Sequence, residues 1–352
     1  MQVKRLAAAL VAATPLFAFA QTNVTMYGIV DVGVESAKDG GPNGRQTMVA
    51  SGDQSTSRIG FRGTEDLGGG LKAIFNLEAG VAADTGAQDA AGLFQRRAVV
   101  GLEGDFGTVT LGREYSPLAS IAGASDEFGQ GFYGSNLSAF SGKNAAVGVN
   151  PRLTRRLANS VNYKSADWMG FKLLAAYSAG ENTAAGAASG DLKGIGAEYT
   201  AGGLYVGAAY HTVKRLASGN DKEYGVGAAY KFADLGGFEI KGNYLAADAT
   251  GPNNKFTEYN LGAGYPFGAS KVLFNYQQQK LSNGAKANAI ALAYTYTLSK
   301  RTNVYASYAS LDNNNQGVFG LTSAGNSAGI TPPAASLGGD PSVFAVGIRH
   351  SF

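Results

Sequence analysis

The sequence predicts an all-β fold: a transmembrane, antiparallel, up-and-down β-barrel of about sixteen strands with an infolded third loop. Three observations lead to this fold class. Segments of roughly ten residues alternate apolar and polar side chains, short turns alternate with long polar loops, and no run of ~20 apolar residues follows the N-terminal segment. Only helices and closed barrels satisfy every backbone polar group in lipid, so the mature chain is either soluble in the periplasm or a barrel.

The N-terminal segment is typical of an export signal, which we predict for residues 1–20. Lys4 and Arg5 supply its positive start, residues 6–17 its apolar centre, and Ala18-Phe19-Ala20 a small-x-small cleavage site. A membrane-anchoring helix is the alternative, but the apolar run is too short to span ~30 Å of hydrocarbon. We therefore expect two regions, a signal peptide at 1–20 and a barrel at 21–352.

Composition limits the classes of partner. The 352 residues include 51 glycines, 18 tyrosines and 18 phenylalanines, whereas only 16% of the residues are charged. The formal net charge of +3 includes Lys4 and Arg5 of the signal, so the mature chain is too balanced to favour nucleic acid. Because the chain has no cysteine, it has no disulfides and no thiolate metal ligands, and we expect neither a metal nor a cofactor.

Strict alternation marks the predicted strands. In residues 71–78, the apolar side chains of Leu71, Ala73, Phe75 and Leu77 share one face of the segment. The same period of two runs through residues 272–279 and 292–298. A soluble sandwich would show the same local pattern, so the connections have to decide between the two folds.

Short turns and long polar loops alternate, which places all long loops at one end of an up-and-down sheet. The turns lie at 66–70, 105–107, 166–170, 201–203, 233–237, 266–268 and 299–301, and the loops near 37–55, 82–93, 181–191, 215–222, 250–256, 282–287 and 312–341. Short periplasmic turns and long external loops are typical of outer-membrane barrels. Roughly 20 residues per strand and connection predict about sixteen strands, enough for an aqueous channel. Aromatic residues near strand ends fit interfacial girdles: Tyr230, Phe232, Tyr265 and Phe267.

The segment 117–155 does not follow the strand pattern. It is a run of Gly, Ala, Ser, Asn and Phe, and its middle places Asp126, Glu127 and Phe128 next to Gly129. A connection this long inside a compact fold is usually functional or disordered. We predict that it folds into the barrel and narrows it.

At this point the chain resembles a known family, the Gram-negative general porins, in particular the trimeric sixteen-stranded porins of β-proteobacteria. The residues that carry the resemblance are 24–31 (VTMYGIVD), 57–73 (SRIGFRGTEDLGGGLKA), 94–98 (FQRRA), 104–113 (GDFGTVTLGR) and 159–163 (NSVNY). The resemblance implies passive diffusion of small hydrophilic solutes and ions through a water-filled channel. It also implies a homotrimer in the outer membrane of a Gram-negative bacterium, in contact with outer-membrane lipid and lipopolysaccharide.

The resemblance also implies a set of constriction residues. Arg58, Arg96 and Arg156 correspond to the wall arginines that face the constriction, although a bulge could exchange Arg96 with Arg97. Asp126 and Glu127 correspond to the opposing acids, next to Phe128 and Gly129 of the constriction loop. Similar porins often have a further acid earlier in this loop, where this chain has small residues such as Gly123 and Ala124, so we expect a mild anion preference. Arg113 and Arg152 could equally be solvated rim charges and are not assigned to the constriction.

Ordinary carboxyl pKa values would place protonation of Asp126 and Glu127 near pH 4. We therefore expect the anion preference to increase as the pH falls through about 4.

The C-terminal residues 344–352 alternate and end on an aromatic carboxy-terminal residue. Phe344, Val346, Ile348, His350 and Phe352 share one parity. By resemblance, Phe352 is predicted to complete the signal that the barrel-assembly machinery reads.

Two other function classes are compatible with an outer-membrane barrel. A closed structural or adhesin-type barrel without conductance remains the alternative, against which the infolded loop and the lumenal arginines argue. An enzyme built on a barrel would need a nucleophile and a base, but the only histidines are His211 and His350, and neither has a visible Ser/Asp arrangement. We therefore expect no enzyme and no catalytic residues.

Overall fold

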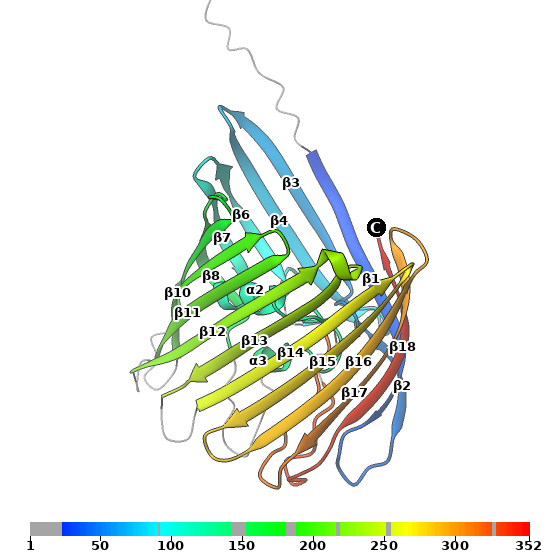
Figure 1. Cartoon of the computed structure of the whole chain (residues 1–352). Coiled ribbons are helices and arrows are strands. Elements are labelled where there is room, and N and C mark those ends of the chain that lie inside the picture. The colour runs from blue at the N-terminus through cyan, green and yellow to red at the C-terminus, as the bar shows by residue number, and fades with distance from the viewer. Residues whose placement is uncertain are drawn as a thin grey trace, which may run out of the picture.

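The computed structural model describes residues 23–90, 92–141, 153–180, 188–215, 219–250, 255–325 and 329–352. The predicted signal peptide at 1–20 and Arg152 lie outside the described residues. In the described part the strands follow one another around a single antiparallel sheet (Figure 1). The strands are β1 (Asn23–Lys38), β2 (Gln46–Ser51), β3 (Arg58–Gly68), β4 (Leu71–Ala82), β5 (Ala87–Gln88), β6 (Arg97–Gly104), β7 (Gly107–Tyr115), β8 (Arg156–Lys164), β9 (Phe171–Ser178), β10 (Ala188–Ala201), β11 (Leu204–Arg215), β12 (Gly219–Phe232), β13 (Phe238–Asp248), β14 (Lys255–Phe267), β15 (Ser270–Leu281), β16 (Lys286–Thr297), β17 (Thr302–Asn313) and β18 (Ser342–Ser351).

The sheet closes on itself because β1 pairs with β18 over the register from Ile29↔Ser351 to Lys38↔Ser342. Strands β2 and β3 pair with the two halves of β1 and together make one wall strand, and β5 is a two-residue strand in the loop after β4. Counted in this way, the described residues form sixteen wall strands, which confirms the predicted barrel. The seven predicted short turns all connect neighbouring strands at one end, and the longer loops lie at the other end (Figure 1).

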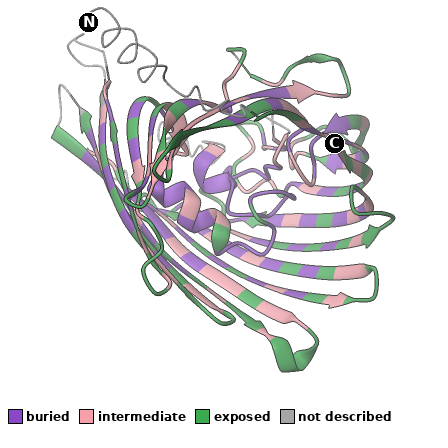
Figure 2. Ribbon diagram, turned by 90° about the horizontal axis from the view of Figure 1, so that it is seen from above, coloured by how far each residue is buried: buried purple, intermediate pink, exposed green. Residues whose placement is uncertain are grey.

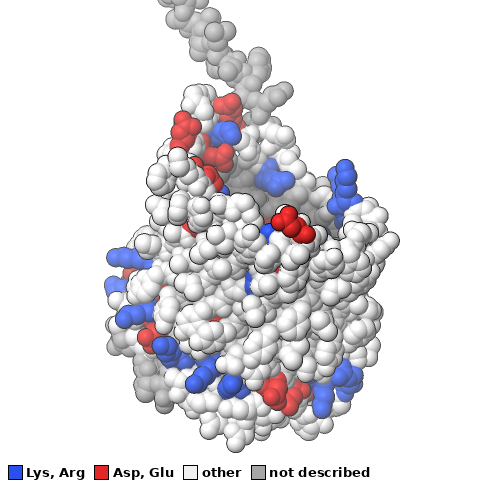
Figure 3. All heavy atoms as spheres, viewed as in Figure 1, with Lys and Arg blue, Asp and Glu red and all other residues white. Residues whose placement is uncertain are grey.

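Alternation along the strands separates a lumenal face from an outer face. In β16, Ala289 and Ala291 are 2% and 1% exposed, whereas the neighbouring Ile290 and Leu292 are 53% and 49% exposed. On the outer face that Figure 3 shows, the middle carries few charges, and Lys, Arg, Asp and Glu gather mainly toward the two ends. This surface is that of a protein whose solvent is hydrocarbon at mid-height and water at the ends.

Aromatic rings lie where girdles were predicted. Tyr230 contacts Phe232 with ring centroids 4.6 Å apart, and Tyr265 contacts Phe267 at 6.2 Å. Both pairs are next to short turns, and Tyr230, Tyr265 and Phe267 are exposed. Such rings place an apolar body in lipid and a polar edge in the interface.

The connection between β7 and β8, residues 116–155, is here called loop L3, and its described part folds into the barrel, as Figure 2 shows. Its described part contains α2 (Pro117–Ala124) and α3 (Ser138–Ser141); a 3₁₀ turn, η2 (Ala233–Leu235), lies between β12 and β13. Helix α2 begins where the Ser116 side chain accepts the Ala119 N–H at 3.1 Å and Pro117 occupies the first turn. The sequence pattern did not predict these helices. Among the described residues, no helix has the length and hydropathy to cross a membrane.

Candidate functional site

Loop L3 packs against one side of the lumen, on a wall built of very small residues. Helix α2 packs on the inner face of β10, β11 and β12. A Cβ atom added to Gly225 would lie 2.9 Å from Leu118 Cδ1, and one added to Gly227 would lie 2.6 Å from Ser125 Cβ. Any side chain at these two positions would push the helix away from the wall. The glycines therefore position L3 inside the channel.

Amide side chains of the same wall bind the rest of the loop. Asn275 donates to the Gly134 carbonyl at 2.8 Å, and Gln277 donates to Ser138 Oγ at 2.6 Å. Near β1, the Tyr133 hydroxyl donates to Glu35 at 3.0 Å. Loop L3 is thus attached by hydrogen bonds and packing along the wall from β10 around to β1.

Asp126 is buried within L3 and organises the loop. Its carboxylate accepts the backbone N–H groups of Phe128, Gln130 and Asn136 at 3.0 to 3.1 Å. Burial raises the pKa of Asp126 to about 6, although these hydrogen bonds oppose the shift. We expected this acid to face the arginines across the pore, but the structure directs it into its own loop.

Glu127 points at the wall that L3 covers. Its carboxylate lies 2.7 Å from Lys271 Nζ and 3.8 Å from Lys241 Nζ, on β15 and β13. Burial raises the pKa of Glu127 to about 7, and Lys271 acts in the opposite direction. This acid, too, is turned away from the arginines, because its two lysine partners belong to the covered wall.

Phe128 and Gly129 shape the bend after the acids. Phe128 is buried and packs edge-on against Phe132 with ring centroids 5.6 Å apart, and Phe132 packs on Tyr305 of β17 at 5.4 Å. Gly129 has φ +57°, in the left-handed region that glycine adopts without strain. Phe128 packs the loop against the barrel wall and Gly129 allows its bend, so both residues shape the loop. Their part in the constriction itself stays a prediction.

The predicted arginines come together on the opposite, uncovered wall. Arg96 Nε donates to Glu78 Oε1 at 2.6 Å, and Arg58 Nη1 lies 3.6 Å from the same oxygen. Tyr27 also donates to Glu78, at 3.0 Å. One buried carboxylate on β4 therefore holds two guanidinium groups and compensates one of their two charges.

A second group of arginines surrounds Tyr115 of β7. Arg156 Nη2 donates to the Tyr115 hydroxyl at 2.7 Å, and Arg96 Nη2 donates to it at 3.4 Å. The Arg156 guanidinium lies 4.5 Å from the Tyr115 ring centroid, and that of Arg155 lies at 5.8 Å. Burial and the neighbouring Arg156 lower the pKa of Arg155 to about 9, so it remains charged at neutral pH.

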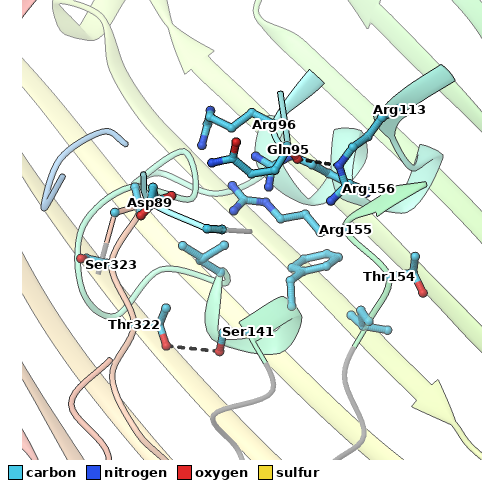
Figure 4. A pocket seen from close by; sticks show the side chains of 16 residues that line it. Asp89, Gln95, Arg96, Arg113, Ser141, Thr154, Arg155, Arg156, Thr322 and Ser323 are labelled. Atoms are coloured by element: carbon cyan, nitrogen blue, oxygen red, sulfur yellow. Dashed lines mark hydrogen bonds between the residues drawn. The ribbon is translucent and has the colours of Figure 1, made fainter. Parts of the chain in front are cut away.

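These arginines open onto a cavity of about 420 Å³ between L3 and the loops after β4 and β17 (Figure 4). Arg96, Arg113, Arg155 and Arg156 line it, and the one acid among its described lining residues is Asp89. Arg113 is held by donating to the Gln95 carbonyl at 2.5 Å. Burial raises the pKa of Asp89, and the neighbouring arginines oppose that shift. The site therefore has a strong excess of positive charge and of hydrogen-bond donors.

The sequence left open whether Arg96 or Arg97 faces the lumen. In the structure both side chains point into the barrel, and they contact different groups. Arg97 begins β6 and donates to Glu114 Oε2 at 2.8 Å, on the other side of L3 from the cavity. Arg96 precedes the strand and joins Glu78 and Tyr115.

Several residues of this site were not predicted from the sequence. Glu78 was visible only as a polar position in an alternating strand, and Arg155 only as the neighbour of Arg156. Their signal would have been the lumenal parity of each strand, but the pairing of Glu78 with Arg96 joins residues of different strands and loops.

The C-terminal Phe352 lies where the barrel closes. Its backbone accepts the Gly28 N–H at 3.0 Å and donates to the Gly28 carbonyl at 3.1 Å. Its ring is exposed on the outer face, in line with Ile348 and Val346 of β18. The predicted role in assembly concerns a machinery outside this chain and stays a prediction.

Comparisons with known proteins agree with this architecture. The family model for Gram-negative porins matches residues 7–316. Outer membrane porin protein 32 of Delftia acidovorans is 35% identical over 99% of this chain and 99% of its own, and an outer membrane porin protein of Bordetella pertussis is 32% identical over 88% and 94%. The solved anion-selective porin from Comamonas acidovorans has a TM-score of 0.81 at 30% identity, covering 94% of this chain and all of that one. This chain therefore belongs to the Gram-negative porin family and forms a channel in the outer membrane of a Gram-negative bacterium.

Proposed function

We propose that this porin is a size-limited diffusion channel that prefers anions, and that its selectivity arises at the arginine cluster. The observation that carries the proposal is the arrangement of charge across the lumen. Arg58, Arg96, Arg113 and Arg156 lie on the uncovered wall, and Arg155 lies at the adjoining end of L3. Asp126 is turned into its own loop, and Glu127 is turned toward the covered wall. The similar porin from Comamonas acidovorans is an anion-selective one, which supports the same sign of selectivity here.

The magnitude follows from Coulomb's law. A unit charge ~6 Å from a passing ion changes the energy of that ion by about 0.7 kcal/mol at the dielectric constant of water, and by more in a partly dry neck. Glu78 compensates one arginine, so Arg58 and Arg96 together leave one net charge, to which Arg113, Arg155 and Arg156 add. Screening over ~10 Å at 0.1 M salt reduces the sum. The result is a preference of several-fold or more for anions without strict exclusion of cations.

Reversal potentials in planar bilayers across a tenfold KCl gradient test the proposal. The wild-type channel should be anion-preferring, and the Arg58→Ser/Arg156→Ser double variant should shift toward cations and conduct more, because charge and side-chain volume are both removed. Equal reversal potentials for the two proteins would show that the arginine cluster does not set the selectivity.

Membership of a porin family indicates a channel rather than an enzyme. His211, the residue that an enzyme hypothesis would need, binds the constriction loop and the wall. We extend the proposal to a homotrimer, exported by a signal peptide at 1–20, in contact with lipopolysaccharide and assembled by the barrel-assembly machinery. Cross-linking of outer-membrane preparations tests the trimer, and N-terminal sequencing of the mature protein, expected to begin at Gln21, tests the signal.

A further inference from the structure

Both ends of loop L3 contact the same two side chains of the barrel wall. At its start, the Leu118 N–H donates to His211 Nε2 at 3.2 Å. At its end, Thr154 donates to Glu223 through its backbone N–H at 3.0 Å and its hydroxyl at 2.7 Å. His211 Nδ1 and Glu223 Oε2 are 3.2 Å apart, so the four groups form one continuous chain of hydrogen bonds.

This series of hydrogen bonds requires the neutral imidazole of His211, in one tautomer. Nε2 must carry a lone pair to accept the Leu118 N–H, so the proton of the neutral ring resides on Nδ1 and is donated to the Glu223 carboxylate. That carboxylate then accepts three hydrogen bonds, two from Thr154 and one from His211. An imidazolium would present an N–H to the Leu118 N–H and would break the link to the start of the loop.

The His211–Glu223 pair is buried and closely packed. His211 is fully buried, and Glu223 is 4% exposed. A Cβ at Gly194 of β10 would lie 2.7 Å from His211 Cδ2, so the ring occupies space that only glycine leaves. The Leu118 N–H belongs to the first turn of α2, so His211 Nε2 accepts one of the N–H groups that have no partner within the helix.

Few other charges face the ring. On β12 the lumenal face carries Asp221 and Glu223, and the end of L3 carries Arg155. Gly194 of β10 and Leu118 of α2 are uncharged, whereas Lys193, Lys214 and Lys222 occupy the opposite parity of their strands.

We propose that His211 and Glu223 are positioning residues of the constriction, which hold both ends of L3 and thereby set the pore cross-section and the place of Arg155 and Arg156. The ends of the loop are also joined to each other, because the Ser116 N–H donates to the Arg155 carbonyl at 3.0 Å and Ser116 Oγ donates to the Thr154 carbonyl at 2.7 Å. His211 and Glu223 therefore bind two loop ends that are already hydrogen-bonded to each other. Arg155 and Arg156 follow Thr154 directly in the chain, so a shift of Thr154 moves them too. The inference rests on the proposed constriction at this site.

Four variants test it in single-channel recordings. His211→Phe fills the space but cannot bind Leu118 or Glu223, and Thr154→Val removes the hydroxyl donor from the loop side. His211→Gln keeps a donor and an acceptor without a titratable ring. Asp221→Asn is the matched control, since Asp221 lies on the same face of β12 and accepts from Thr250 of another loop at 2.8 Å.

We expect His211→Phe to show at least threefold more frequent subconductance events than wild type at neutral pH, and Thr154→Val a smaller increase in the same direction. His211→Gln and Asp221→Asn should resemble wild type. Heat-modifiable migration on gels checks that every variant has folded.

If folded His211→Phe and Thr154→Val channels are as quiet as wild type, the pair does not position the loop. The idea also fails if folded His211→Gln, which keeps a donor and an acceptor, shows as many subconductance events as His211→Phe. Reversal potentials measured on the same channels separate this inference from the anion preference. An unselective wild-type channel would refute that preference and would leave the event frequencies as a valid test of the positioning pair.

Discussion

Replacing Glu78 with glutamine should strengthen the anion preference, because Glu78 is an acid in direct contact with the constriction arginines. Its Oε1 lies 2.6 Å from Arg96 Nε and 3.6 Å from Arg58 Nη1. The glutamine side chain keeps the shape, its carbonyl oxygen can still accept from Arg96, and its NH₂ group can donate to the Tyr27 hydroxyl, so the substitution chiefly removes one negative charge from the uncovered wall.

The expected magnitude comes from the position of that charge. A unit charge ~6 Å from the ion path lowers the energy of an anion by about 0.7 kcal/mol when it is made more positive, and raises that of a cation by the same amount. The difference of about 1.4 kcal/mol corresponds to roughly a tenfold change in the permeability ratio, and screening in 0.1 M salt reduces it to about three- to tenfold.

Reversal potentials across a KCl gradient, measured at several salt concentrations, give this ratio. The matched control is Glu103→Gln, since Glu103 pairs at 3.3 Å with Lys72 on an exposed part of the wall where water screens the charge. An unchanged ratio in Glu78→Gln, a shift toward cations, or an equal shift in the control would refute the electrostatic account of the constriction.

Three further expectations follow from the geometry. Burial raises the pKa values of Asp126 to about 6 and of Glu127 to about 7, above the ordinary carboxyl range. Both acids therefore lose negative charge as the pH falls from 8 to 5, so the anion preference should rise modestly in that window rather than near pH 4. A titration of the reversal potential against pH measures this change. Gly227→Ala should displace α2 at a cost of about 1–3 kcal/mol and raise the frequency of subconductance events, whereas Gly242→Ala, whose added Cβ would meet only Asn260 and Leu261 of the neighbouring strand, should leave the recordings unchanged. Deletion of Phe352 should lower the amount of folded, heat-modifiable protein in the outer membrane without changing export, and equal amounts from both genes would contradict the assembly role.

The barrel could be predicted from sequence because its determinants are local. A period of two specifies which residues of each strand face lipid, and glycine-containing turns at 66–70 or 201–203 specify where strands reverse. The interruption between β2 and β3 escaped prediction, since it depends on how both strands divide the length of β1 between them.

The candidate site was predictable only in part. The resemblance predicted Arg58, Arg96 and Arg156 as constriction residues, and the structure brings them together on one wall; lumenal parity and the porin motifs both apply to strand residues and their immediate neighbours. It gave Asp126 and Glu127 the wrong direction, because the orientation of a loop acid depends on partners far away in the chain, such as Lys271. For the same reason His211 had no visible partner: Glu223 is directly opposite it only once β11 and β12 are paired.

The division of the lumen separates the loop L3 acids from the arginine cluster. Loop L3 needs a wall that accepts it, and this chain supplies one from β10 around to β1 with glycines, alanines and amides that pack against the loop or bind it. The two acids of the loop take part in that attachment: Asp126 accepts backbone N–H groups of the loop, and Glu127 pairs with lysine. In the described part of the chain, the wall from β3 to β8 does not have to accommodate the loop in this way, so its side chains can be long and charged. On the proposed mechanism we therefore expect the uncovered wall to dominate the field in the channel, and changes to the covered wall to act on pore size and current noise more than on selectivity.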